Sequence, residues 1–257
     1  MFNFHNKEYD NVWFTSDEHY GSDRHITLSK RLEFDETLEI YKKLSVLEPT
    51  CFKKLRACSV YGMFGETIKT PVDKMNDEII DKHNLRVGDN DLVFHIGDFG
   101  DYECAKYLNG HHVLLMGNYE YDDCNKKYGG NIDRFREDIV SKYNFIDVCP
   151  DYILDMEKMS DNHLTMMLKD EVSFIYMTHK PADCVYYLGH DGCNSKIDYN
   201  NNKHIMNLFG HIHEKGKVKR FGLNVGVDCN YHYPTSSVEV TFYLKAILHH
   251  YDENVFM

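Results

Sequence analysis

Two histidines, His211 and His213, stand two positions apart in the stretch "NLFGHIHEKG". In an extended segment, residues two positions apart point to the same side of the backbone. Neutral imidazole nitrogens on one side of a segment are good ligands for divalent metals, although paired histidines also occur on solvated surfaces. The remaining polar clusters of the chain decide between these two interpretations.

Further potential ligands follow short apolar runs. Four runs rich in strand-forming residues end in polar clusters: "NVWFTSDEHYG", "DLVFHIGDFG", "HHVLLMGNYEYDD" and "VSFIYMTHKP". Each is typical of a buried strand with a loop at its carboxyl end. The clusters and the histidine pair supply carboxylate, amide and imidazole groups, which suit first-row divalent metals. The candidate ligands are Asp17, His19, Asp98, Asn118, His179, His211 and His213.

The combination of clusters is more informative than any one of them. Asp17 and His19 are two apart, so an extended backbone can direct both at one ion. Two cations about 3.5–4 Å apart need a shared carboxylate to offset their repulsion, and Asp98 can supply it. A lone cluster of this kind would more often be a solvated loop, but five together predict a dinuclear metal site.

The elements that must position these groups alternate between strand and helix. The stretch "TPVDKMNDEIIDKHNLRVG" has Thr70 and Pro71 as a cap and first-turn proline, followed by apolar residues at helical spacing. This alternation favours an α/β layered fold with ligands at the carboxyl ends of the strands. Between Leu208 and Leu244 we expect more strands, in "NLFGHIH", "RFGLNVGVD" and "SSVEVTFYL".

Residues 31–69 interrupt the alternation. The stretches "DETLEIYKKLSVLEP" and "CFKKLRAC" are locally helical and lengthen the connection after the first strand. We expect one domain over residues 1–257, with a helical insertion or cap at 31–69 near the site. A pair of ordinary core helices explains the same pattern equally well.

Composition narrows the functional classes. The formal net charge of −12 would repel long nucleic acid, whereas bound cations would create a local positive site. The eight cysteines form no CxxC pair, which argues against a zinc ribbon or thioredoxin-like centre. The amino-terminal segment lacks the features of a signal peptide, and no apolar run is long enough to cross a membrane. We therefore expect a cytoplasmic protein with free thiols and no membrane partner.

The motif order resembles a known family. The blocks "SDEHYG", "GDFG", "GNYE", "THKP" and "GHIH" resemble the five signature blocks of the calcineurin-like metallophosphoesterases. The stretches "VDKMNDEIIDKHNLRVGDNDLVFHIGDFG", "LNGHHVLLMGN" and "NVGVDCNYHYPTS" extend the similarity to the compact phosphoesterases of bacteria and phages. The resemblance implies a four-layer α/β/β/α sandwich with two central mixed sheets flanked by helices.

The resemblance also implies ligand sets and chemistry. The first ion would be held by Asp17, His19, Asp98 and His213. The second ion would be held by Asp98, Asn118, His179 and His211. Manganese is the expected metal, with iron, nickel or zinc as alternatives. A hydroxide bridging the two ions would attack the phosphorus atom, with Asn118 and the cations neutralising charge on the phosphoryl oxygens.

The third block departs from the family, which normally has a histidine after the asparagine. Here that position is Tyr119, and a phenol is a poorer proton donor at neutral pH than an imidazole. His25 is a candidate substitute donor, and Arg24 is a candidate ligand for a phosphate oxygen. The alternative is that Arg24 caps a helix and His25 lies on the surface.

These observations predict a metal-dependent phosphoric ester hydrolase. A phosphodiesterase acting on a nucleotide or another small phosphodiester is favoured, because relatives without the third-block histidine tend toward diesters. A phosphomonoesterase or nucleotide pyrophosphohydrolase remains open. A binding module that has lost its chemistry through Tyr119 also remains open.

The other histidines and the basic run have simpler interpretations. We expect His95 to be a satisfied core residue, His249 and His250 to lie on the surface, and His111 and His112 to be turn residues before a strand. The basic run beside the last block is expected to be a solvated hairpin rather than a nucleic-acid track. It comprises Lys215, Lys217, Lys219 and Arg220.

Overall fold

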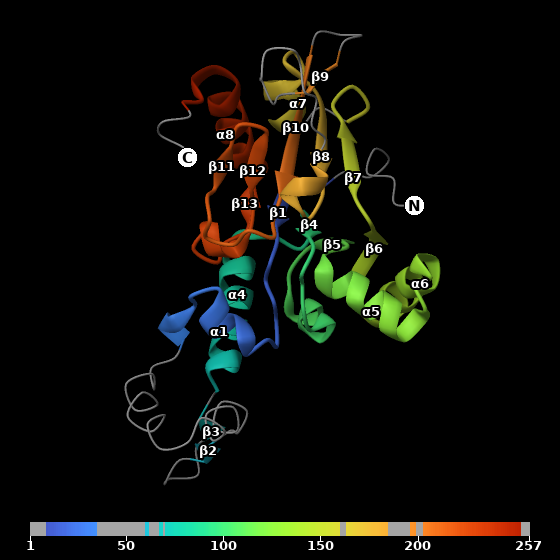
Figure 1. Ribbon diagram of the computed structural model, residues 1–257, viewed down its shortest axis with the longest axis vertical. Coiled ribbons are helices and arrows are strands. Elements are labelled where there is room, and N and C mark those ends of the chain that lie inside the picture. The colour runs from blue at the N-terminus through green and yellow to red at the C-terminus, as the bar shows by residue number, and fades with distance from the viewer. Residues whose placement is uncertain are drawn as a thin grey trace.

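Two mixed β-sheets and several helices make up the described part of the chain (Figure 1). The computed structural model describes residues 9–34, 60–61, 67–68, 70–159, 163–184, 196–198 and 203–252. The mixed α/β class predicted from the alternating pattern is therefore confirmed.

The first sheet has the strand order β13-β1-β4-β5-β6. Its strands are β13 (Thr235–Ser236), β1 (Val12–Thr15), β4 (Leu92–Ile96), β5 (His111–Leu115) and β6 (Phe145–Cys149). β1, β4, β5 and β6 are parallel, and β13 runs antiparallel to β1. Every residue of β4 is buried, as expected for a parallel strand covered on both faces. The carboxyl ends of the parallel strands lie at one edge of the sheet.

The second sheet has the order β11-β12-β10-β8-β7, with β9 also paired to β10. Its strands are β7 (Tyr152–Asp155), β8 (Val172–Met177), β9 (Lys196–Asp198), β10 (Lys203–Phe209), β11 (Val218–Lys219) and β12 (Gly222–Asn224). β8, β10 and β12 are parallel, so their carboxyl ends also share an edge. A separate pair consists of β2 (Val60–Tyr61) and β3 (Thr67–Ile68).

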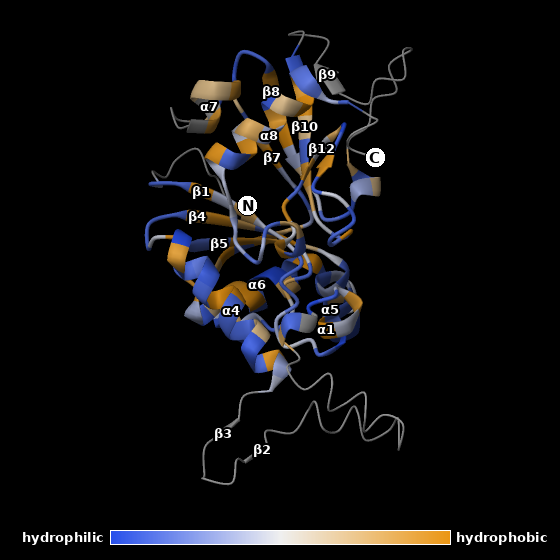
Figure 2. Cartoon of the chain, turned by 90° about the vertical axis from the view of Figure 1, so that its left-hand side faces the viewer, coloured by the Kyte–Doolittle hydropathy of each residue, from blue (hydrophilic) through white to orange (hydrophobic). Residues whose placement is uncertain are grey.

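Helices pack against the first sheet on the face away from the second sheet (Figure 2). They are α4 (Pro71–Arg86), α5 (Asn118–Tyr128) and α6 (Ile132–Lys142). Two buried residues from α4, Met75 and Ile79, and two from α6, Phe135 and Ile139, join Leu114 of β5 in one apolar cluster. Burial of each such side chain stabilises the fold by about 1.5–3 kcal/mol.

A second apolar cluster joins the two sheets to each other. Phe14 and Phe94 of the first sheet and Ile175 and Leu208 of the second belong to it, and the Phe14 and Phe94 rings stack at 5.8 Å. Helices α7 (His163–Leu168) and α8 (Ser237–His250) contribute further residues to the same cluster. This shared core fixes the two carboxyl edges relative to each other.

Short helices complete the described elements. They are α1 (Arg24–Leu28) and the 3₁₀ helices η2 (Leu32–Phe34), η3 (Tyr102–Tyr107), η4 (Pro181–Asp183) and η5 (Val227–Cys229). The helix expected after Thr70 is confirmed as α4: the Thr70 hydroxyl accepts from the Asp73 N–H, and the Asp73 carboxylate accepts from the Thr70 N–H.

The expected strand in "SSVEVTFYL" is wrong. Only Thr235 and Ser236 form a strand, and α8 begins at Ser237. The Ser236 hydroxyl accepts from the Glu239 N–H, and the Glu239 carboxylate accepts from the Ser236 N–H. This capping box and the packing of Val240 and Leu244 into the core outweigh the strand preference of β-branched residues.

The turn assignment of His111 and His112 is also wrong, because both belong to β5. His112 is fully buried and bonds to His95, whose other nitrogen bonds to Glu18, so the core assignment of His95 is confirmed. His249 and His250 are exposed, as expected. Lys219 and Arg220 of the basic run lie in the expected hairpin, formed by β11 and β12, and Lys215 and Lys217 precede it. Lys215 is exposed, and the other three are half-buried.

Most of residues 31–69 lies outside the described residues, including both stretches expected to be helical. The described cysteines, Cys104, Cys124, Cys149, Cys184 and Cys229, are free thiols as expected. Among the described residues, no helix has the length and apolar character needed to span a bilayer.

Candidate metal centre

The first sheet brings four of the predicted ligands to its carboxyl edge. Asp17 and His19 follow β1, and Asp98 follows β4. Asn118 follows β5 and is the first residue of α5. Because β1, β4 and β5 are parallel neighbours, these loops lie next to one another.

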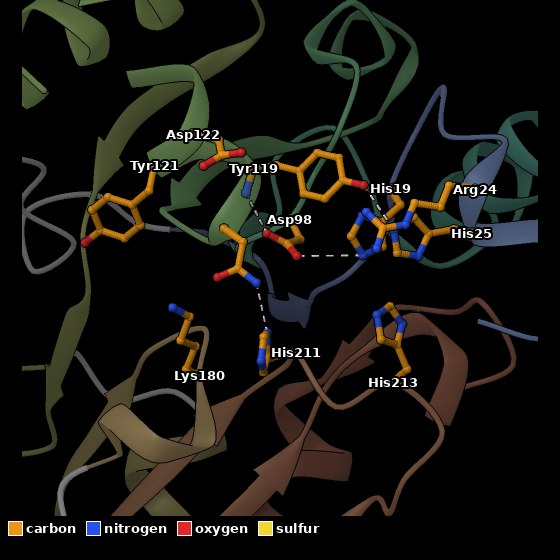
Figure 3. Close-up of a pocket in the computed structure, with 11 residues that line it drawn as sticks. His19, Arg24, His25, Asp98, Tyr119, Tyr121, Asp122, Lys180, His211 and His213 are labelled. Carbon is orange, nitrogen blue, oxygen red and sulfur yellow. Dashed lines mark hydrogen bonds and ion pairs between the residues drawn. The ribbon is translucent and has the colours of Figure 1, made fainter. Parts of the chain in front are cut away.

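The second sheet brings the other three predicted ligands to the same place. His179 follows β8, while His211 and His213 follow β10. The close-up shows His211 and His213 facing Asp98 and His19 across a cleft between the two sheets (Figure 3). The seven residues singled out by the sequence therefore converge.

The ligand-bearing loops adopt left-handed backbone conformations. The φ angles are 58° at Asp17, 52° at His19, 57° at Asp98, 72° at His211 and 50° at His213. The extended backbone expected at Asp17 and His19, and at His211 and His213, is therefore wrong. Left-handed non-glycine residues are uncommon, and they cluster at functional sites where surrounding contacts enforce them.

Hydrogen bonds between the loops supply those contacts. The Asp17 N–H donates to the Gly97 carbonyl at 3.1 Å, and the His211 N–H donates to Asp17 Oδ2 at 2.8 Å. A Cβ atom at Gly97, where φ is 83°, would lie 2.7 Å from the Gly117 Cα. Only glycine therefore allows the β4 and β5 loops to approach this closely.

Two groups of side chains meet at Asp98. The ligand atoms of Asp17, His19 and Asp98 all lie within 4.8 Å of one another. The same holds for Asp98, His179 and His211. These buried groups could hold a metal ion, and the Asp98 carboxylate belongs to both.

Unpartnered buried nitrogens support metal binding at this place. His19 is 1% exposed, and neither of its ring nitrogens has a hydrogen-bond partner among the described residues. Because buried polar atoms are nearly always satisfied, these nitrogens indicate a ligand, and imidazole with carboxylate is a donor set that suits a divalent cation.

The charges of the group couple Asp98 to His179. Burial opposes ionisation of Asp98, but His179, the Tyr119 N–H and His211 outweigh it and lower the carboxyl pKa. Burial also opposes protonation of His179, but Asp98 and Asp17 raise its pKa to about 9. For His19, burial and the neighbouring His25 and Arg31 hold the pKa well below its ordinary value.

His213 is placed differently from the expectation. Its ring stacks near His19 and His25, with centroids 5.2 and 5.3 Å away, and these three histidines form a third possible ligand group. His213 Nδ1 lies 2.6 Å from Asp228 Oδ2, which leaves Nε2 as the nitrogen for a ligand. The expected set of Asp17, His19, Asp98 and His213 is therefore split between two groups.

A buried ion pair supports this part of the site. The Arg31 guanidinium, 1% exposed, donates to Asp228 Oδ1 at 2.7 Å. It also donates to the backbone carbonyls of Asp17 at 2.5 Å and Glu18 at 2.7 Å. Burial opposes ionisation of Asp228, but His213 and Arg31 lower its pKa to about 2. Asp228 thus stays ionised and fixes the orientation of His213.

Glu120 connects the loop after β4 to the loop after β5 through hydrogen bonds. Its fully buried carboxylate accepts from the N–H groups of Asp98 at 2.9 Å, Phe99 at 3.0 Å and Gly117 at 2.8 Å. Burial and the Asp98 charge raise its pKa to about 7. The contacts tie the start of α5 to the loop after β4.

The candidate proton donors lie together beside His19. The Tyr119 hydroxyl lies 3.1 Å from His25 Nε2, and the His25 ring stacks on His19 with centroids 3.4 Å apart. The alternative that His25 is a surface residue is wrong, because it is 6% exposed. Burial, Arg31 and His213 lower its pKa to about 4, so His25 is neutral at pH 7. Arg24 lies in the first turn of α1 and lines the cleft.

The cleft has a volume of about 500 Å³. Its lining includes the predicted Arg24, His25, Asn118 and Tyr119 as well as ligand-group residues. Asn118 Nδ2 lies 3.2 Å from His211 Nδ1, which places the Asn118 amide beside the second ligand group. A further cation, Lys180, also lines the cleft.

Comparisons with known proteins do not assign a family. No family model matches the chain, and no curated protein matches it. One solved structure, of a protein of unknown function, AQ665, from Aquifex aeolicus, aligns over 90% of this chain and 97% of its own. Its sequence is 15% identical and the TM-score is 0.43, so the likeness carries no functional argument.

Four site residues were missed at the level of sequence. Glu120 and Lys180 lie inside the motif blocks "GNYE" and "THKP", and Asp228 lies in "NVGVDCNYHYPTS". Their positions in these blocks were a usable signal. Arg31 had none, because its partner Asp228 is 197 positions away.

Proposed function

We propose that the chain is a dinuclear metal-dependent phosphoesterase of the calcineurin-like superfamily, with phosphodiesters as its favoured substrates. The observation that carries the proposal is the sharing of Asp98 between two adjacent ligand groups. A carboxylate between two ion sites offsets the repulsion of cations set about 3.5–4 Å apart. We further propose that the two sheets and their helices form the four-layer sandwich of that superfamily.

The residues would take distinct roles. Asp17 and His19 would hold one ion, His179 and His211 with Asn118 the other, and Asp98 both. His213 would join through Nε2, since Asp228 occupies Nδ1. Two divalent cations, manganese first and iron, nickel or zinc as alternatives, would lower the pKa of a bound water and neutralise phosphoryl charge.

The other cleft residues bind and orient the substrate. Arg24 and Lys180 line the cleft on opposite sides of the ligand groups, where each can bind a phosphoryl oxygen (Figure 3). Tyr119 can donate a hydrogen bond to an oxygen of the phosphate or leaving group. His25 is neutral at pH 7, and its proposed part is to position the Tyr119 hydroxyl, which lies 3.1 Å from His25 Nε2.

The proposed diester preference rests on the resemblance, in which relatives without a histidine at the position of Tyr119 tend toward diesters. A phenol assists poor leaving groups less than an imidazole does, and general acid catalysis contributes about 10²–10⁴-fold. The substrate would be a nucleotide or another small phosphodiester, because an overall charge of −12 disfavours long polyanions.

Metal counting and a substrate panel test the proposal. Protein loaded with manganese and freed of excess metal should contain two ions per chain by elemental analysis. It should hydrolyse p-nitrophenyl diesters faster than p-nitrophenyl phosphate. Asp98→Asn should lose metal and activity, whereas Asp133→Asn, an exposed carboxylate on α6, should retain both.

Each result separates the alternatives. Far faster turnover of monoesters would make the diester preference wrong and favour a phosphomonoesterase or pyrophosphohydrolase. Two bound metals and tight nucleotide binding without turnover would favour a binding module. Absence of bound metal under these conditions would overturn the proposal as a whole.

A further inference from the structure

A second cavity adjoins the candidate metal centre. Its volume is about 240 Å³, and it shares Tyr121 and Lys180 with the main cleft. His179, one of the proposed ligands, also lines it. Tyr121 and Lys180 lie at the end of the cleft opposite Arg24 and His25 (Figure 3). The second cavity, called the side cavity below, therefore begins on the His179 side of the centre.

Two carboxylates, one lysine and His179 are the charged or titratable groups in the described lining of the side cavity, apart from its two phenols. Asp151 and Asp183 line it, and Lys180 is the single basic side chain among its described lining residues apart from His179. Tyr176 donates its hydroxyl proton to Asp151 Oδ2 at 2.8 Å. Burial and this hydrogen bond raise the pKa of Tyr176, and burial with Asp151 and Asp183 raises that of Tyr121. Both phenols therefore stay neutral near pH 7.

The two carboxylates disfavour a second anion placed beside them. The Asp151 and Asp183 carboxylates accept hydrogen bonds from hydroxyl or amino groups and repel phosphate or carboxylate groups. The Tyr121 and Tyr176 rings offer apolar faces on which a flat ring can pack. Lys180 lies at the border of the two cavities, where it can bind a phosphate held in the main cleft.

Size narrows the ligand further. Pockets for whole drug-sized molecules occupy about 300–1,000 Å³, and the side cavity is smaller than that range. It is large enough for one part of a substrate, such as a sugar or base ring.

We propose that the side cavity binds the neutral half of a small phosphoester, a sugar or base ring with hydrogen-bond donors, while its phosphate lies at the metal centre. Asp151 and Asp183 are the specificity-determining residues in this assignment. It rests on the proposed function, since the phosphate position is taken from it.

Equilibrium binding of two nucleotides tests the assignment. Manganese-loaded protein is titrated by calorimetry with thymidine 5′-phosphate and with thymidine 3′,5′-bisphosphate. The wild-type protein should bind the first more tightly by about three- to tenfold, the effect expected of two partly screened carboxylates acting on the added phosphate. The double variant Asp151→Asn/Asp183→Asn should bind the two nucleotides about equally.

A matched control removes the same charge elsewhere. Asp133→Asn/Glu137→Gln neutralises two exposed carboxylates on α6 that line neither cavity, and it should keep the wild-type ratio. Asp151 and Asp183 are themselves exposed, so the double variant should fold, which circular dichroism and thermal melting verify.

A wild-type preference for the bisphosphate, equal binding of both, or no binding of either would overturn the assignment. An unchanged ratio in the double variant would do the same.

Hydrolysis of thymidine 5′-(p-nitrophenyl) phosphate is measured on the same samples. If the protein hydrolyses this diester but does not bind thymidine 5′-phosphate more tightly than the bisphosphate, the side-cavity assignment is overturned and the proposed function stands. If the wild-type protein shows this binding preference, the double variant loses it, and neither turns over the diester, the assignment is supported and the proposed hydrolysis is overturned.

Discussion

The Asp98 carboxylate lies 3.3 Å from Nε2 of His179, with both side chains buried. The pair joins the two sheets, since Asp98 follows β4 of the first and His179 follows β8 of the second. His179 Nδ1 also lies 2.9 Å from the Ile96 carbonyl, which fixes its ring. The pKa of His179 is about 9, so without a metal its ring is protonated at pH 7. The proposed function places a cation where the Nε2 proton lies.

The first prediction concerns pH and the metal-free protein. The pKa of His179 in the folded protein is about 9, above its ordinary value of 6.5. The folded protein therefore binds the imidazolium proton more tightly than the unfolded chain does. Its contribution to stability is complete below pH 6.5 and is lost as the pH rises through about 9. Urea unfolding in a chelator should show the free energy of unfolding falling over this window.

The His179→Asn variant should flatten that decline, while His250→Asn, an exposed histidine of α8, should leave it unchanged. Because a metal must displace the same proton, the apparent manganese affinity of the wild-type protein should rise over this pH window. A manganese affinity independent of pH across the window would contradict the assignment of His179 as a ligand.

The second prediction concerns Asp228, which orients His213 and holds Arg31. Asp228→Asn should weaken metal affinity by about 10–100-fold, the usual cost of removing a carboxylate that orients a histidine ligand. Titration of metal-free protein with manganese, followed by calorimetry, measures the change.

Asp91→Asn is the matched control for this substitution. Asp91 is also a buried carboxylate, but it bonds to Asn11 and Trp13 near the start of β4, at the opposite end of the strand from Asp98. We expect it to lower stability and leave the metal affinity unchanged. Equal metal affinity of Asp228→Asn and wild-type protein would contradict the role of Asp228 in orienting a metal ligand.

The positions of the ligands were predictable from the sequence because they depend on a local rule. An apolar run followed by a polar turn places its polar residues at the carboxyl end of a strand, and parallel strands bring those ends together. Asp98 and His179 were located in this way without any long-range information. The strands β1, β4, β5 and β8 followed from the same pattern.

The conformation of the loops and the supports beneath them were not predictable. Spacing indicated an extended backbone at His211 and His213, but hydrogen bonds from other loops enforce left-handed angles there. Arg31 and Asp228 meet only after the fold has formed. In α8 the strand preference of single residues was outweighed by a cap and by burial, which depend on tertiary packing.

The third prediction concerns the loop contacts of Glu120. Glu120→Ala leaves three buried N–H groups without their acceptor and should lower the free energy of unfolding by about 3 kcal/mol or more. Glu239→Ala, which removes the equivalent cap residue of α8, should cost about 1 kcal/mol. Chemical denaturation of both variants compares the two costs.

Glu120→Gln keeps one carbonyl oxygen as an acceptor and should fall between Glu120→Ala and the wild-type protein. Similar stabilities of Glu120→Ala and Glu239→Ala would show that the buried carboxylate does not tie the two loops together.

The fourth prediction concerns Tyr119, whose hydroxyl lies 3.1 Å from His25 Nε2. On the proposed function, Tyr119→His places an imidazole of ordinary pKa near 6.5 where a phenol now stands, and so supplies a better proton donor at neutral pH. The gain in kcat/KM should be largest for alcohols that leave poorly and smallest for p-nitrophenol, because an easy leaving group needs little protonation. A series of aryl and alkyl diesters measures it as a shallower dependence of log kcat/KM on leaving-group pKa.

Tyr107→His, on the exposed side of η3, should leave the slope unchanged. An equal gain or loss for every leaving group would indicate that Tyr119 positions the substrate and takes no part in proton transfer.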